Sequence, residues 1–277
     1  MCLILLSACD SKPLTDDPKI HAAPESVTEC LIYADGNTIS ERFKVPAGFK
    51  RIETQAGSFA HFLQNLKLKP AGTKVKYYDG REKLRNVYLA VVDYPLGKRD
   101  LQQCADAVMR LRAEYLFSEN RKDEIKFRFV NGFLADFSKW AEGYGISVIG
   151  NTVSWVRNEK NNDSYESLQK YLDIVYAYAS TLSLEKELTD KPLSDLFIGD
   201  VFIQGGSPGH CVIVVDMAIN TKTDEKIFML AQSYMPAQDI QILIGDVKDS
   251  PWFSADISDT LIMPEWIFDI TDLKTWK

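Results

Sequence analysis

The chain has few of the residues that build a metal centre and no excess of positive charge. It contains three histidines among 277 residues and no Cys-x-x-C pair, so the sequence gives no support for a zinc site. The formal net charge is -7, which argues against nucleic acid, because neutralising phosphates requires a basic surface. We therefore expect no metal ion, no other cofactor and no nucleic-acid partner.

Long apolar runs are also absent. No stretch of eighteen apolar residues occurs, so we expect nothing to span a membrane in the mature protein. Aromatic residues, by contrast, are plentiful, with 14 Phe, 12 Tyr and 5 Trp. A hydrophobic content of 45% suits an ordinary globular protein with a large core.

The first nine residues resemble the end of a bacterial lipoprotein signal. Leu3 to Leu6 form a short apolar run, and Leu6-Ser7-Ala8-Cys9 is similar to the lipobox. In a lipobox a peptidase cuts before the cysteine, and the thiol carries a diacylglycerol. The resemblance implies an exported protein, in the periplasm or at the cell surface, held to a membrane by acyl chains on Cys9. The alternative is an irregular N-terminus with a chance cysteine.

The rest of the chain divides into a tether and one globular domain. Residues 10–40 are rich in Asp, Ser, Pro, Thr and Lys and show little periodicity, which is typical of a tether. Periodic apolar patterns begin near residue 42. We therefore assign residues 1–9 to the signal, 10–40 to the tether and 41–277 to a single domain.

The cysteine count leaves at least one thiol without an internal partner. There are 5 cysteines, and removal of Cys2 and lipidation of Cys9 would leave Cys30, Cys104 and Cys211. An odd number outside the cytoplasm leaves one thiol free or bonded to another chain.

The hydrophobic pattern places most helices before a late group of strands. The predicted helices span 59–66, 101–117 and 164–184, and Ser58 is the predicted cap of the first. The predicted strands span 74–78, 87–92, 125–129, 200–203, 210–218, 227–234 and 240–244. Helices followed by an antiparallel sheet indicate an α+β fold.

The helix over 101–117 begins close to a cysteine. Asp100 suits an N-cap, and Gln103 stands three residues later, where a capping box places Glu or Gln. Cys104 then lies in the first turn, on the buried stripe of the helix, where the partial positive charge favours a thiolate. Two interpretations stay open: a nucleophile, or a small hydrophobe of the core.

A glycine-rich loop leads into a strand that begins with a histidine. Gly199-Asp200-Val201-Phe202-Ile203 is followed by the loop 204–209 and by His210-Cys211-Val212-Ile213-Val214-Val215. The loop is not a phosphate loop, because no Gly-Lys-Ser or Gly-Lys-Thr follows and no helix begins there. A histidine at a strand edge is commonly a solvated surface residue, so His210 alone does not establish a site.

Together the two segments resemble the papain-like superfamily, and within it most closely the NlpC-type cell-wall peptidases and related amidases. The shared pattern is a helix that begins with cysteine, further helices, a Gly-Asp turn and a strand that begins with histidine, over roughly residues 100–235. The Asp-Cys-Ser-Gly signature of the NlpC type is absent. The resemblance implies helices packed on a late antiparallel sheet, with Cys104 as nucleophile and His210 as base. Over its full length the chain also resembles an uncharacterised family of bacterial lipoproteins, which implies no activity.

In that superfamily a polar residue on the next strand orients the histidine. Asp216 is six residues along the same strand, roughly 20 Å away at about 3.3 Å per residue, and so too distant. The returning strand brings Gln232 or Ser233 opposite His210, and we favour Gln232 because its amide oxygen accepts a proton from the ring. Gln103, or its neighbour Gln102, is the candidate oxyanion donor, although a cap role for Gln103 is the alternative.

The sequence thus predicts a thiol hydrolase that cleaves amide bonds in the cell envelope. The resemblance implies peptidoglycan stem peptides, or another peptide, as the substrate. A non-catalytic envelope lipoprotein that uses the papain-like fold as a binding or scaffold module is the alternative. A third interpretation places Cys104 in a structural disulfide with Cys30 or Cys211.

Overall fold

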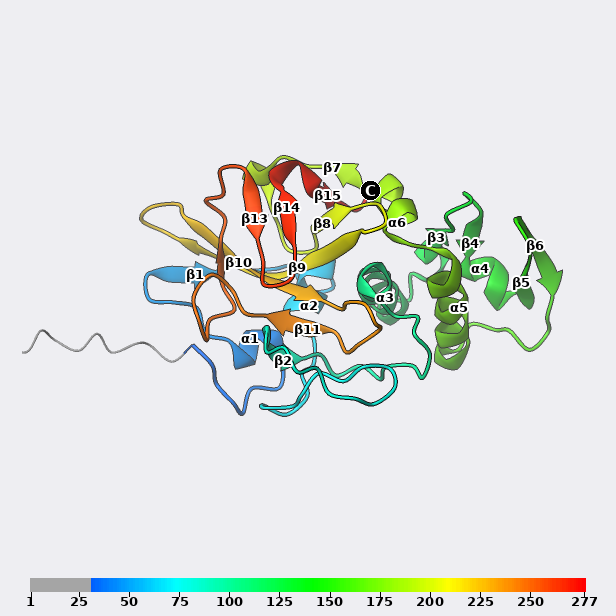
Figure 1. Ribbon diagram of the computed structural model, residues 1–277, viewed down its shortest axis with the longest axis horizontal. Helices are drawn as coiled ribbons and strands as arrows, with labels where there is room; N and C mark the ends of the chain where they lie inside the picture. The colour runs from blue at the N-terminus through cyan, green and yellow to red at the C-terminus, as the bar shows by residue number, and fades with distance from the viewer. Residues whose placement is uncertain (1–30) are drawn as a thin grey trace, which may run out of the picture.

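The computed structural model describes residues 31–277, and its centre is one large antiparallel sheet (Figure 1). The main path of this sheet runs in the order β2 (Tyr88–Val91), β11 (Gln241–Leu243), β10 (Lys226–Gln232), β9 (His210–Asn220), β8 (Val201–Gln204), β15 (Leu273–Thr275) and β7 (Thr189–Asp190). Two short strands complete it: β1 (Phe49–Arg51) pairs with β9, and β12 (Phe253–Ser254) pairs with β10. All of these pairings are antiparallel.

Six α-helices, three short 3-10 helices and three separate hairpins surround the sheet in the described part of the chain. The helices are α1 (Ile39–Arg42), α2 (Phe59–Gln64), α3 (Cys104–Ser118), α4 (Phe137–Ala141), α5 (Tyr165–Tyr178) and α6 (Thr181–Glu187). The hairpins are β3 (Lys126–Arg128) with β4 (Leu134–Asp136), β5 (Tyr144–Ile149) with β6 (Thr152–Arg157), and β13 (Thr260–Ile262) with β14 (Ile267–Asp269). The predicted α+β class is therefore confirmed.

Strand β9 is the centre of the core. Every residue from His210 to Ala218 is buried, so both faces of the strand are covered. Helices α2 and α3 pack against β9, while the β13–β14 hairpin packs against β8 and brings Phe268 to Phe202. Burial on both faces explains why the strand is a continuous run of apolar residues rather than an alternating one.

The late strands were predicted correctly and with nearly correct limits. The predicted strands at 200–203, 210–218, 227–234 and 240–244 correspond to β8, β9, β10 and β11, and 87–92 and 125–129 correspond to β2 and β3. The helix after Ser58 is also confirmed, since the Ser58 hydroxyl accepts a hydrogen bond from the His61 backbone N–H at 3.1 Å.

Three element predictions are wrong. The helix predicted over 164–184 is two helices, because the chain is extended at Ala179 and Ser180, and the Ser180 side chain caps α6. Residues 74–78 form only isolated bridges, one of them between Tyr77 and Gln238, and not a strand. The helix predicted from residue 101 begins at Cys104 with Gln103 as N-cap, because Asp106, and not Gln103, supplies the side chain of the capping box.

The predicted tether is too long at its C-terminal end. Ile39 is fully buried, Thr38 caps α1, and Ile32 pairs with Phe43 by an isolated bridge. Residues 31–40 are therefore part of the folded domain. The signal, Cys9, Cys30 and the rest of the tether lie outside the described residues.

Candidate active site

The structure brings Cys104 and His210 together at one end of the sheet. Cys104 is the first residue of α3, and His210 is the first residue of β9, on which α3 packs. The imidazole is close enough to the thiol to lower the pKa of Cys104, as a hydrogen-bond partner and by its charge. The two residues that the sequence singled out, 106 positions apart, are thus direct neighbours.

Gln232, the last residue of β10, holds the other side of the imidazole. Its Oε1 lies 2.9 Å from Nε2 of His210. Because Nε2 is engaged there, Nδ1 is the ring nitrogen that remains for the Cys104 thiol. Both His210 and Gln232 are only 1% exposed, so solvent does not compete for this bond. The glutamine therefore fixes both the direction and the tautomer of the imidazole.

Two charged residues, Glu265 and Lys83, continue the chain of side-chain contacts beyond Gln232. The sequence did not indicate either of them. Gln232 Nε2 donates to Glu265 Oε2 at 2.8 Å, and the same oxygen accepts from Lys83 Nζ at 2.6 Å. The Lys83 and Glu265 side chains are 3% and 9% exposed. Burial lowers the pKa of Lys83, opposed by its bond to Glu265. The buried ion pair gives the Gln232 amide an acceptor and so sets which way the amide faces.

Aromatic rings surround the imidazole. The ring centroids of Tyr234, Trp266 and Phe268 lie 4.7, 5.2 and 6.0 Å from that of His210. Trp266 is fixed in turn, because its Nε1 donates to Gln204 Oε1 at 2.9 Å. Neither Glu265 nor Trp266 could be found from the sequence, because both stand between two short strands that carry no clear alternation.

The electrostatic surroundings of Cys104 favour its thiolate. Hydrogen bonds from the side chain and backbone of Cys211, together with a bond to His210 and its charge, hold the pKa of Cys104 well below its usual value, against the opposing effect of burial. The N-terminus of α3 adds a partial positive charge at the same sulfur. For Cys211, burial and the neighbouring Cys104 raise the pKa well above its usual value. Of the two thiols, Cys104 is the one prepared to ionise.

The segment before α3 is tied down by the chain that follows β10. Ser233 Oγ donates to the Gln102 carbonyl oxygen at 3.1 Å, and Asp100 Oδ1 accepts from the Ala237 backbone N–H at 2.6 Å. These bonds fix the start of α3 relative to the strand that carries Gln232. Ser233 is therefore engaged with the backbone and does not reach the imidazole.

The two glutamines before the cysteine have different surroundings. Gln102 is buried, and its Oε1 accepts from Arg110. Gln103 lines the same cavity as Cys104, but its Nε2 donates to Asp100 Oδ1 at 3.1 Å. The Cys104 backbone N–H has no carbonyl within the helix to donate to, as at the start of any helix. A developing oxyanion would find this backbone donor first, and Gln103 only after its bond to Asp100 opens.

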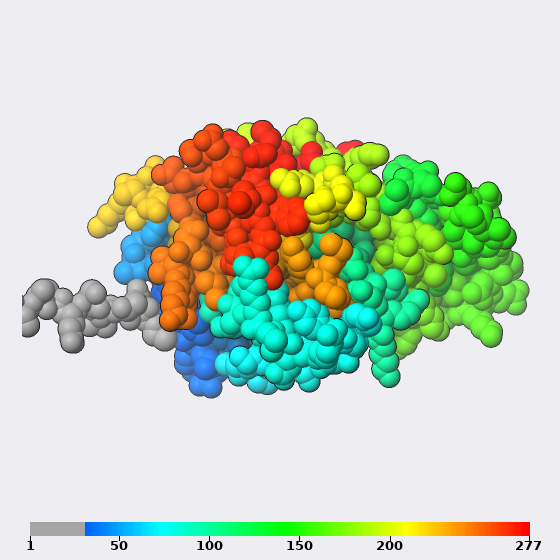
Figure 2. Space-filling model, viewed as in Figure 1, coloured from blue at the N-terminus to red at the C-terminus, as the bar shows by residue number. Residues whose placement is uncertain are grey.

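A cavity of about 360 Å³ opens onto Cys104. Its walls are the start of α3, the end of α5 with the start of α6, the loop between β8 and β9, and Met235. The loop rests on α6, because Gly205 N–H donates to Glu185 Oε1 at 2.9 Å and a Cβ on Gly209 would come within 2.5 Å of Thr181 Oγ1. In Figure 2 this loop (yellow) adjoins the segment after β10 (orange) at the molecular surface. The thiol is thus buried by its neighbours yet reached through a cavity.

One buried carboxyl in this cavity has an unsatisfied oxygen. Asp106 Oδ2 accepts from the Gln103 backbone N–H at 3.0 Å, but Oδ1 is buried without a hydrogen-bond partner. Burial raises the pKa of Asp106 well above its usual value, and the nearby Cys104 adds to the effect. The carboxyl group therefore has one oxygen that is free to bind a ligand in the cavity.

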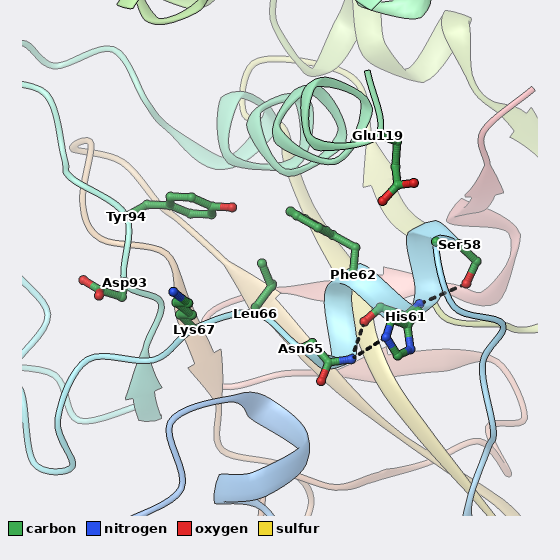
Figure 3. A pocket seen from close by; sticks show the side chains of 10 residues that line it. Ser58, His61, Phe62, Asn65, Leu66, Lys67, Asp93, Tyr94 and Glu119 are labelled. Atoms are coloured by element: carbon green, nitrogen blue, oxygen red, sulfur yellow. Dashed lines mark hydrogen bonds between the residues drawn. The ribbon is translucent and has the colours of Figure 1, made fainter. Parts of the chain in front are cut away.

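A second pocket lies away from this cluster, beside α2 and the C-terminal end of α3 (Figure 3). Phe62 and Tyr94 face each other across it, and Lys67 and Glu119 stand at its edges. His61 belongs to it, but both ring nitrogens are within 3.5 Å of neighbouring side chains, Thr54 and Asn65. It contains no cysteine and does not join the Cys104 cavity.

The described residues contain no group of three or more His, Cys, Asp or Glu placed to hold a metal ion. None of the helices in residues 31–277 is long and apolar enough to cross a bilayer. Cys104 and Cys211 are both free thiols, so the interpretation that pairs them in a structural disulfide is wrong. The pairing of Cys104 with Cys30 concerns a residue outside the described part.

Comparison with known proteins gives one match. The model of a family described as a domain of unknown function (4846) matches residues 39–275. The chain belongs to this family. The match begins at the first residue of α1 and ends in β15, so it covers nearly the whole described domain, including Cys104, His210, Gln232 and Glu265. No curated protein and no solved structure matches the chain significantly.

Proposed function

We propose that this member of the family is a papain-like thiol hydrolase that cleaves amide bonds. The observation that carries the proposal is the buried row Cys104–His210–Gln232, in which a thiol at a helix N-terminus meets an imidazole held by a polar side chain. This is the arrangement that nucleophilic catalysis by cysteine requires. A core cysteine would need neither the imidazole nor the cavity beside it.

The geometry supports a two-stage reaction. His210 Nδ1 takes the thiol proton, and the Cys104 sulfur attacks the carbonyl carbon of the substrate amide. The Cys104 backbone N–H stabilises the oxyanion, and the imidazolium then gives its proton to the leaving amine. Water, deprotonated by His210, attacks the acyl-enzyme and releases the acid and the free thiol. Gln232 holds the imidazole in place throughout.

The substrate that we propose is a peptide of the cell envelope, such as a peptidoglycan stem peptide. The resemblance of residues 100–235 to NlpC-type peptidases supports it, as does a cavity whose walls carry Asp106 and Thr181 as polar groups for a peptide. The alternative is that the protein binds the same peptides without cleaving them, and a cleavage assay distinguishes the two.

Purified protein should cleave peptidoglycan fragments, and Cys104→Ala and His210→Ala should reduce cleavage to background. Mass spectrometry of soluble stem peptides identifies the cut bond by the addition of water. His61→Ala is the matched control, because His61 is outside the site, and this variant should keep wild-type activity. Binding without cleavage by the wild type would reject the hydrolase in favour of the binding module. Equal cleavage by Cys104→Ala would show that Cys104 is not the nucleophile.

We also propose that the protein is exported and anchored to a membrane through Cys9. The support is the sequence Leu6-Ser7-Ala8-Cys9, which lies outside the described residues. In cells that carry the full signal, Cys9→Ser should move the protein from the membrane fraction to the soluble fraction, because the acyl chains supply the affinity. Cys30→Ser is the control and should leave the fractionation unchanged. Membrane association that survives Cys9→Ser would show that the anchor is elsewhere.

A further inference from the structure

Cys104 has a second thiol beside it as well as an imidazole. The Cys211 side chain is the largest cause that lowers the pKa of Cys104, so the two thiols are neighbours, and both cysteines are free. They come from elements that pack together, α3 and β9, and both belong to the main hydrophobic core. In the hydrolase proposed above, Cys211 takes no part in any covalent step.

The two thiols differ in access. Cys104 lines the cavity and is 6% exposed, whereas Cys211 is fully buried and is not part of the lining of that cavity. A small oxidant that enters the cavity therefore meets Cys104 first. Cys211 can then react only with the oxidised sulfur of Cys104.

We propose that Cys104 and Cys211 form a reversible disulfide when the protein meets a hydroperoxide, so that the pair is a redox modification site. In the first step the Cys104 thiolate attacks one peroxide oxygen. The S–O bond forms, the O–O bond breaks, and the alcohol or water leaves with a proton from His210. Cys104 is oxidised by two electrons to the sulfenic acid, and the peroxide is reduced by two.

In the second step the Cys211 sulfur attacks the Cys104 sulfur. The S–S bond forms, the S–O bond breaks, and the hydroxyl leaves as water with the Cys211 proton. Burial is the main cause of the raised pKa of Cys211, and the charge on Cys104 adds to it. Sulfenic acid formation removes the second contribution only. A dithiol reductant restores both cysteines by exchange.

The disulfide protects Cys104 from irreversible oxidation, and it stops the proposed hydrolysis for as long as it is present. A sulfenic acid without a resolving thiol proceeds to the irreversible sulfinic acid, whereas a disulfide can be reduced. While the disulfide is present, Cys104 has no thiolate to react with an amide or an alkylating reagent.

The test is peroxide treatment of the folded chain, with peptide mass mapping before and after reduction. We expect a peptide that joins Cys104 to Cys211, loss of iodoacetamide labelling at Cys104, and full recovery with dithiothreitol. Cys211→Ser keeps a hydrogen-bond donor but cannot resolve, so dimedone should trap at least about tenfold more sulfenic acid on Cys104 than in the wild type. A second chain in which Cys2, Cys9 and Cys30 are all serine should still form the bond.

Equal dimedone trapping in the wild type and in Cys211→Ser, with no joined peptide, would overturn the inference, as would a Cys104 that peroxide leaves unmodified. These readouts do not involve amide cleavage. If the protein forms the disulfide but cleaves no peptide, this inference stands and the proposed function fails. If it cleaves peptides but forms no disulfide, the proposed function stands and this inference fails.

Discussion

At pH 6, iodoacetamide should label Cys104 at least about tenfold faster than a free thiol, of which only about 0.3% is ionised at that pH given a pKa of about 8.5. The Cys211 hydrogen bonds, His210 and the helix N-terminus all lower the pKa of Cys104, so its thiolate persists where an ordinary thiol is protonated. The gain in rate is smaller than the gain in thiolate, because nucleophilicity falls as the pKa falls. Labelling against pH, read by peptide mass, measures the effect.

Replacement of His210 by alanine should remove most of this advantage, since the bond and the charge of the imidazole are both lost. Gln232→Ala should have a smaller effect, because it frees the ring to turn without removing it. Cys211 is the internal control and should resist labelling until the protein unfolds, being fully buried with a raised pKa. A Cys104 rate no higher than that of the free thiol, unchanged in His210→Ala, would show that the thiol and the imidazole do not work as a pair.

Glu265→Ala should cost about 3 kcal/mol or more of folding free energy, the usual effect of removing one partner from a buried ion pair. The substitution leaves the Lys83 ammonium buried without a counter-charge and leaves Gln232 Nε2 without its acceptor. The loss should shrink as the pH rises, because the pKa of Lys83 is already lowered and the neutral amine can be buried more easily. Urea unfolding at pH 7 and at pH 9 measures both values.

Two further variants test the cause of this loss. Glu265→Gln combined with Lys83→Met removes both charges but keeps an acceptor for Gln232, and it should recover most of the stability. Glu53→Gln is the matched control, because the Lys50–Glu53 pair is 68% and 83% exposed and such pairs contribute little. If Glu265→Ala costs no more than Glu53→Gln, the buried pair does not stabilise the domain.

The residues of the candidate site could be predicted from the sequence where each depended on its place in one element. Cys104 and His210 stand at the starts of strongly patterned elements, and helix and strand periodicity fixes where such elements begin to within a few residues. Gln232 was predicted opposite His210 from the length of the turn. The register instead pairs Ala231 with Ile213, after a bulge between Met229 and Leu230, so Gln232 reaches the imidazole from a diagonal position. The structure places all three together.

The rest of the site depends on packing between distant segments, which one sequence does not encode locally. Glu265 and Trp266 belong to a loop between two three-residue strands, and Lys83 stands in an irregular segment between isolated bridges. Cys211 was noted as a residue of the strand, but its contact with Cys104 requires the packing of α3 on β9. The start of α3 was misplaced because Asp100, Gln103 and Asp106 all suit a cap, and the hydrogen bond from Gln103 N–H to Asp106 decides between them.

The position of the ion pair in the chain has a consequence for biosynthesis. During synthesis, the cysteine at 104 leaves the ribosome long before residues 232 and 265 do. Strand β9, which begins with His210, reaches its place in the sheet only after β8 and β10 are available to pair with it. A nascent chain that ends before residue 210 therefore carries an ordinary thiol at position 104, because the neighbours that lower its pKa have not yet been made.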